Sequence, residues 1–189
     1  LGAIADPEGY VDQQAFEVAA DPHLPGRWRA GREALHAALT AYPHGQKMPW
    51  FGPPMSATSM ATARLMETWA HSLDVHEGLG VEVEDTDRIR HVAHLGVRTR
   101  NFAYAVHGLD APTEEIRIDL VSPSGEQWTW GPDDAAQTLT GSASDFCRLV
   151  TQRVHRADTD LVATGPDADR WLDIAQAFAG QPGAGRAPR

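Results

Sequence analysis

Residues 116–130, IRIDLVSPSGEQWTW, decide the fold class of this 189-residue chain. Ile116, Ile118 and Leu120 alternate with polar residues, a Ser-Pro-Ser-Gly segment follows, and two tryptophans then resume the alternation. A period of two places alternate side chains on one face of a β-strand, and a short segment rich in Pro and Gly turns the chain back. The stretch therefore predicts a β-hairpin, although the residues before it have a helical period.

Four segments upstream of the hairpin predict helices. Residues 25–42 begin at a proline and end before another, with apolar residues on one stripe. A second long helix is capped by Ser56 or Ser59 and runs to about residue 79, where glycines end it. Residues 87–106 have one apolar face, and 11–20 form a shorter helix. The intervening loop, 43–59, is too rich in Pro and Gly to be regular.

Downstream of the hairpin, shorter elements alternate. We predict a short strand at 136–140, a helix that starts at a Ser-x-x-Asp capping box and continues to about residue 154, a strand at 161–163 and a last helix. The fold class is therefore α+β. We expect a helical domain over residues 1–108, a small α+β domain over 109–180, and a disordered tail over 181–189, which has nothing to bury.

Composition excludes several classes of function. The formal charge of −10 provides no surplus of Lys and Arg to neutralise phosphates, so we expect neither nucleic acid nor a membrane surface as a partner. No apolar run approaches the roughly 20 residues of a membrane span, and the first residues do not resemble a signal peptide, which predicts a cytoplasmic protein. The single cysteine, Cys147, excludes an internal disulfide and a Cys-rich zinc site. We expect it to be a buried structural thiol.

The sequence ETWAHSLDVH, residues 67–76, carries the candidate chemistry. Glu67 and His71 are four residues apart, so on a helix they stand one turn apart on the same face, a workable spacing for two ligands of one ion. Such pairs also occur on ordinary helix surfaces, so a metal site, a proton-transfer pair and plain surface all stay open. A catalytic zinc ion needs a third protein ligand. His91 and His94 form an alternative pair.

The same helix also resembles a known family. It is similar to the E-x-x-x-H helix of the DinB-like bundle superfamily, and resembles more closely the actinobacterial proteins grouped with mycothiol-dependent maleylpyruvate isomerase. Three stretches carry the resemblance: PWFGPPMSATSMATARLMETWAH at 49–71, RIRHVAHLGVRTRNFAYAVHGL at 88–109, and residues 140–180. The resemblance therefore covers most of the chain, including the small C-terminal domain.

The resemblance implies a DinB-like helical domain of the four-helix-bundle type that binds a divalent metal, most often zinc. It assigns Glu67 and His71 as ligands, together with a His from an early helix that would precede LGAIADPEGY, residues 1–10. We therefore expect the helical domain to be incomplete, with its third ligand unassigned. Uncovered apolar helix faces would follow, which either a segment that precedes residue 1 or a neighbouring chain in a homodimer would cover.

Three hypotheses about function follow from these residues and the resemblance. The first is a metal-dependent isomerase or transferase that uses mycothiol or a similar thiol on a small electrophilic substrate. The apolar loop residues Trp50, Phe51 and Met55 would then either wall the substrate pocket or pack against the helical bundle. The second is a metal-binding or small-molecule-binding protein of the same fold without turnover. The third is an associating domain that binds no metal.

Overall fold

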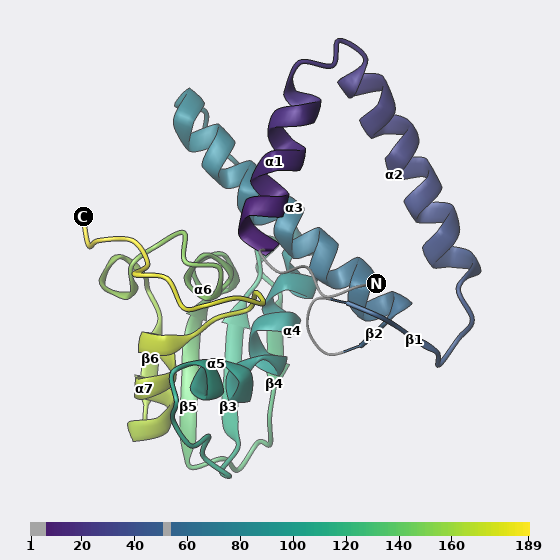
Figure 1. The fold of residues 1–189 in the computed structure, drawn as a ribbon. Helices are drawn as coiled ribbons and strands as arrows, with labels where there is room; N and C mark the ends of the chain where they lie inside the picture. The colour runs from purple at the N-terminus through teal and green to yellow at the C-terminus, as the bar shows by residue number, and fades with distance from the viewer. Residues whose placement is uncertain (1–6, 51–53) are drawn as a thin grey trace.

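A computed structural model describes residues 7–50 and 54–189 and confirms the α+β class (Figure 1). The α-helices along the described residues are α1 (Pro7–Ala19), α2 (Leu24–Ala41), α3 (Ala57–Leu79), α4 (Arg90–Arg98), α5 (Arg100–Val106), α6 (Ala143–Val150) and α7 (Pro166–Ile174). The strands are β1 (Lys47–Met48), β2 (Met55–Ser56), β3 (Ile116–Val121), β4 (Gln127–Trp130), β5 (Gln137–Ser142) and β6 (Val162–Thr164). None of the described helices has both the length and the apolar character that crossing a bilayer requires.

The predicted hairpin forms one side of a four-stranded sheet with the order β4-β3-β5-β6, in which β4 is an edge strand and β3 is central. β3 and β4 pair antiparallel, with Leu120 opposite Trp128, and β6 pairs antiparallel with β5. β5, the predicted third strand, lies parallel to β3. The alternation of residues predicts strands but not their neighbours, so this parallel pairing was not foreseen.

One core joins the sheet to the helices that precede it. The apolar face of β3 is buried, and Phe146 of α6 meets Trp171 of α7 edge to face, with ring centroids 5.7 Å apart. Met66 of α3 and Val92 of α4 belong to the same buried cluster. Residues on both sides of the predicted boundary at residue 108 therefore share a core.

Three local predictions were wrong in detail. The predicted helix at 87–106 is a 3₁₀ turn followed by α4 and α5, which separate at Thr99, where the hydroxyl donates to the carbonyls of Leu95 and Gly96. The helix from Ser142 ends at Val150, because the chain turns through a left-handed Gln152 with φ 59°. The loop at 43–59 contains the short ladder of β1 and β2.

The first two helices lie apart from this core. In Figure 1, α2 stands away from α3 over most of its length, and the chain returns to α3 through β1 and β2. No residue of α2 is buried. Phe16 is 80% exposed and Trp28 57% exposed. The uncovered apolar helix faces expected from the sequence are therefore present.

Helix α4 approaches α6 closely at Gly96. A Cβ atom at this position would stand 3.0 Å from Val150 Cγ2 and 3.1 Å from Phe146 Cε1. Real Cβ atoms rarely come so near their neighbours, and α6 is itself packed on the sheet, so it has little room to move. A glycine is therefore needed here for close approach, not for its backbone angles.

We expect Gly96→Leu to destabilise the fold by about 1–3 kcal/mol, because the larger side chain overpacks the contact with α6. Urea unfolding followed by tryptophan fluorescence measures the change. Gly31→Leu on α2 is the matched control, since nothing lies within 4 Å of a Cβ atom there. Equal urea midpoints for the two variants would show that the contact at Gly96 does not limit packing.

Candidate metal centre

Helix α3 carries both candidate ligands. It starts at Ser56, whose hydroxyl oxygen accepts a hydrogen bond from the Ser59 amide at 3.1 Å, and it ends at the left-handed Gly80. Ser56 is thus the cap, one of the two serines that the sequence suggested. The buried side chains of this helix are Met60, Met66 and Ala70. Glu67 and His71 lie on a different, more exposed face.

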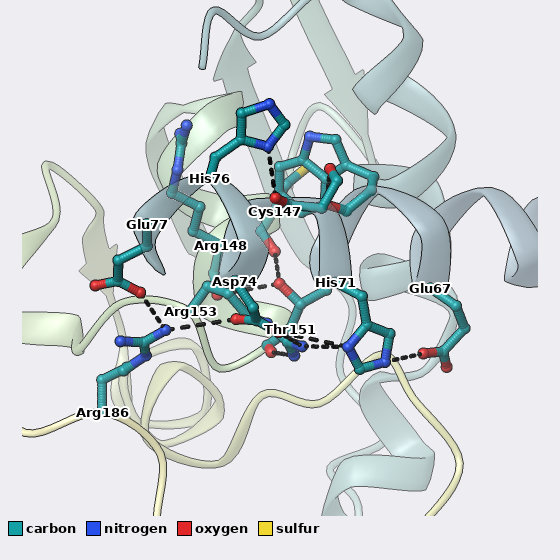
Figure 2. Close-up of polar contacts among 12 residues, drawn as sticks. Glu67, His71, Asp74, His76, Glu77, Cys147, Arg148, Thr151, Arg153 and Arg186 are labelled. Atoms are coloured by element: carbon teal, nitrogen blue, oxygen red, sulfur yellow. Dashed lines mark hydrogen bonds and ion pairs between the residues drawn. The ribbon is translucent and has the colours of Figure 1, made fainter. Parts of the chain in front are cut away.

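Glu67 and His71 point toward one another along α3 (Figure 2). The distance from His71 Nε2 to Glu67 Oε2 is 3.4 Å, and the side chains are 68% and 41% exposed respectively. Two ligand atoms at about 2.0–2.2 Å from one zinc ion are about 3.3–3.6 Å apart at a tetrahedral angle. The observed separation therefore fits two ligands of a single ion.

The other nitrogen of the His71 ring faces an ion pair between Asp74 and Arg153. His71 Nδ1 is 3.4 Å from Asp74 Oδ2, and that oxygen accepts a hydrogen bond from Arg153 Nη2 at 2.7 Å. The hydrogen bond from Arg153, with a smaller contribution from His71, lowers the pKa of the Asp74 carboxyl group. Arg153 lies 79 residues after Asp74, so helix periodicity could not have paired them.

The described residues do not complete a metal site. In residues 7–50 and 54–189, no group of three or more His, Cys, Asp or Glu side chains is placed to hold a metal ion. Asp74 contacts the ring nitrogen opposite Nε2, so it cannot share an ion with that atom. His94, of the alternative pair, accepts a hydrogen bond from Trp130 Nε1 at 3.2 Å. Glu67 and His71 thus fit as two ligands, and a third is required.

Further hydrogen bonds and ion pairs fix the middle and the end of α3 against the rest of the chain. Trp69 Nε1 donates to Asp85 at 3.1 Å, and the buried Asp85 carboxylate pairs with Arg148 of α6 at 2.8 Å. At the helix end, Glu77 pairs with Arg186 at 2.6 Å and with Arg189 at 3.0 Å. The tail, for which composition predicts disorder, is therefore placed in contact with α3.

A pocket of about 730 Å³ adjoins the site. Arg153 connects the two, because it lines the pocket and also contacts His71. Arg148, Arg186 and His76 add positive or titratable groups to the lining, and Leu73 adds an apolar one. The pocket is large enough for a small organic molecule beside the candidate metal pair.

The structure describes two of the three predicted pocket residues. Met55 lies in β2, half-buried and paired with Met48, and Trp50 is exposed. Phe51 lies outside the described residues. Their part in a substrate pocket stays a prediction.

Cys147 is the buried thiol that the sequence suggested. It lies on α6 within the core and donates to the Ile89 carbonyl, with the sulfur 3.4 Å from the oxygen. Burial, together with the nearby Asp85 carboxylate, raises the pKa of the thiol far above its ordinary value. Because the thiolate is the reactive form, Cys147 does not act as a nucleophile.

The family model described as mycothiol maleylpyruvate isomerase N-terminal domain matches residues 3–76, which include both Glu67 and His71. Two uncharacterized proteins of Mycobacterium tuberculosis, from strains CDC 1551 and H37Rv, are each 58% identical over 186 residues, covering 97% of this chain and 72% of the relative. The chain belongs to this mycothiol maleylpyruvate isomerase-like family.

The C-terminal part of the chain matches a second family model. A family model described as wyosine base formation matches residues 112–164, the segment that contains all four strands of the larger sheet. No solved structure matches the chain. The candidate site thus lies within the segment that the isomerase family model covers, on its last helix.

We expect Cys147 not to react with the thiol reagent dithiobis(2-nitrobenzoate) in the folded protein, and to react promptly once urea unfolds the protein. Burial and the raised pKa both suppress the thiolate in the native state. Absorbance at increasing urea concentrations follows the reaction. Rapid modification without urea would show that α6 opens readily and would put the packing described above in doubt.

Proposed function

We propose that this chain binds a divalent metal ion, with zinc as the first candidate, through Glu67 and His71, and that it acts as a thiol-dependent isomerase or transferase on a small electrophilic substrate. The observation that carries the proposal is the 3.4 Å separation of His71 Nε2 and Glu67 Oε2 on an exposed helix face. The match of residues 3–76 to the isomerase family model supports it.

The third ligand belongs to the proposal as well. We propose that α1, α2 and α3 form part of a DinB-like bundle and that a second copy of the chain completes it. Support comes from α2, which leaves all its residues unburied, and from the exposed Phe16 of α1. Apolar helix faces of this kind are typical of surfaces that another chain covers. A homodimer would therefore both cover these faces and add a ligand.

The thiol in this proposal is external to the protein. Cys147 is buried in the core, so in this proposal mycothiol or a similar small thiol supplies the sulfur. A bound divalent cation lowers the pKa of a coordinated thiol and so supplies a nucleophile at neutral pH. A reduced small thiol is a feature of the cytoplasm, which is the location we propose.

The chain's own residues have separate tasks in this scheme. Glu67 and His71 hold the ion, and the neighbouring pocket, with Arg153 at its border, receives the organic substrate. Trp50, Phe51 and Met55 precede α3, and neither Trp50 nor Met55 lines this pocket, so their contact with a substrate is a separate part of the proposal. The guanidinium of Arg156 pairs with Asp169 and Asp173 of α7, so it has a structural task.

A second candidate is a metal-binding or small-molecule-binding protein of the same fold without turnover. The observation that favours it is that the described residues place two ligands together and no more. The metal-binding form of this candidate also requires metal at Glu67 and His71, so metal content does not separate it from the first candidate. Turnover of an electrophilic substrate that depends on added thiol does.

Metal content measured by mass spectrometry, on protein dialysed under identical conditions, tests the shared claim. We expect nearly one divalent ion per chain in the parent protein and a loss of at least tenfold in the Glu67→Ala, His71→Ala double variant, because a single weak ligand does not retain zinc through dialysis. Light scattering on the same samples reports whether the metal-bound form is a dimer.

The matched control is the His91→Ala, His94→Ala double variant, which removes two exposed histidines from α4 and keeps α3 intact. It should retain the parent's metal content. Absence of metal from the parent, or equal metal content in the parent and the α3 double variant, would contradict the proposed site.

A further inference from the structure

The C-terminal tail, residues 181–189, holds its position with little apolar burial. In Figure 1 it continues beyond α7 as a yellow trace without helix or strand. Its sequence, QPGAGRAPR, contains no large apolar residue, and only Pro182 and Arg186 are partly buried. The hydrophobic effect scales with the apolar area removed from water, so it contributes little here. Polar contacts therefore have to hold the tail.

The segment before the tail is anchored in the core. The Ala177 amide donates to the carbonyl of Val150, the last residue of α6, at 2.7 Å. The side-chain nitrogen of Gln176 donates to the carbonyls of Phe178 and Gly180, at 3.0 Å each. Gln176 is only 1% exposed, so the core fixes its position. Residues 176–180 thus form a fixed root from which the tail extends.

The far end of the tail is held by ion pairs with α3, of which Figure 2 shows those of Arg186. Arg186 Nη2 lies 2.6 Å from Glu77 Oε2 and 3.5 Å from Asp74 Oδ1. Arg189 Nη2 lies 3.0 Å from the other oxygen of Glu77, and the Arg189 amide donates to the Asp158 carboxylate at 3.0 Å. Glu77 therefore pairs with both arginines of the tail.

The ion pairs of Glu77 are exposed and therefore weak. The Glu77 side chain is 45% exposed, and those of Arg186 and Arg189 are 38% and 81% exposed. Exposed pairs contribute little to stability, and salt screens them. Between the root and these pairs lies Gly185, where a Cβ atom would meet nothing within 4 Å. The tail can therefore open while the core stays folded.

The tail also forms part of the wall of two cavities. Arg186 and Arg189 line the pocket of about 730 Å³ described above, opposite residues from the end of α3. Residues 183–186 line a second cavity of about 500 Å³, together with residues of α6 and α7. Arg186 and His155 border both cavities. The position of the tail therefore determines how far each cavity is open to solvent.

We propose that residues 181–189 form a strap over the two cavities, which the ion pairs of Glu77 with Arg186 and Arg189 hold closed. When these pairs break, the strap opens about its root at residues 176–180 and exposes both cavities. The strap involves no metal ion and does not depend on the proposed function, which places the substrate in the larger cavity. It adds a device that controls entry to that cavity.

Backbone order parameters from nitrogen-15 NMR relaxation test the closed strap directly. At about 0.01 M salt, where exposed charges interact over a long range, we expect the non-proline residues of the tail in the parent to have values above about 0.6. At about 1 M salt the values should fall below about 0.6, because the ion pairs are screened. Glu77→Gln, which keeps the size of the side chain and removes its charge, should give low values at both concentrations.

Glu82→Gln is the matched control, since it removes the same charge just after α3 from an exposed side chain that does not line either cavity. Its tail should be as ordered as that of the parent. Order parameters in α6 and α7 report that each variant keeps its core. A tail that is mobile in the parent at low salt, or that stays ordered in Glu77→Gln or at high salt, would overturn the proposal.

Trypsin cleavage after Arg186 is a second readout and needs neither metal nor substrate. A guanidinium that is paired with Glu77 cannot enter the protease's own binding pocket, so cleavage reports the open fraction of the strap. Loss of two exposed ion pairs should speed cleavage in Glu77→Gln about three- to tenfold, and Glu82→Gln should stay within about twofold of the parent. Mass spectrometry follows the loss of residues 187–189. Equal rates in the parent and Glu77→Gln would contradict the strap and would leave the metal proposal unaffected.

Discussion

The close packing of α4 on α6 at Gly96 is the contact on which the architecture depends. It brings Val92 of α4 into the cluster that contains Phe146, Trp171 and the buried face of β3, so the helical part and the sheet part of the chain share one core. Burial of these side chains is the main favourable term in folding. Because Met66 joins the same cluster, the middle of α3 is held against this core as well.

The candidate metal pair lies where α3 passes from the packed part of the molecule to the open part. On the packed side, Trp69 of α3 donates a hydrogen bond to Asp85, which pairs with Arg148 of α6. Asp74 of α3 pairs with Arg153. On the other side, α1 and α2 keep their apolar residues exposed. A ligand face that is rigid on one side and uncovered on the other is suited to receiving a further helix, and with it a third ligand.

Much of the secondary structure could be predicted from local patterns. The alternation at Ile116, Ile118 and Leu120 predicted β3, and serine caps predicted the starts of α3 and α6. The ends of elements were less predictable, because the left-handed Gln152 and the break at Thr99 depend on local hydrogen bonds that composition does not specify. The parallel pairing of β3 with β5 depends on which strands meet, and a single sequence does not contain that information.

The candidate site was predictable only along one helix. The spacing of Glu67 and His71 predicted that the side chains would meet, and the structure places them 3.4 Å apart. The ion pair of Asp74 with Arg153 joins residues 79 positions apart, which helical spacing does not predict. The geometry of the Glu67–His71 pair thus follows from helical spacing, whereas the residues around the pair come from distant segments of the chain.

The most direct test of the metal site is a crystal structure of the protein grown with Zn²⁺ and recorded on both sides of the zinc absorption edge. The account predicts an anomalous peak at about 2.0–2.2 Å from both His71 Nε2 and a Glu67 carboxylate oxygen, with a third protein ligand completing the shell. Zinc bound at other residues, with Glu67 and His71 paired only to each other, would contradict it.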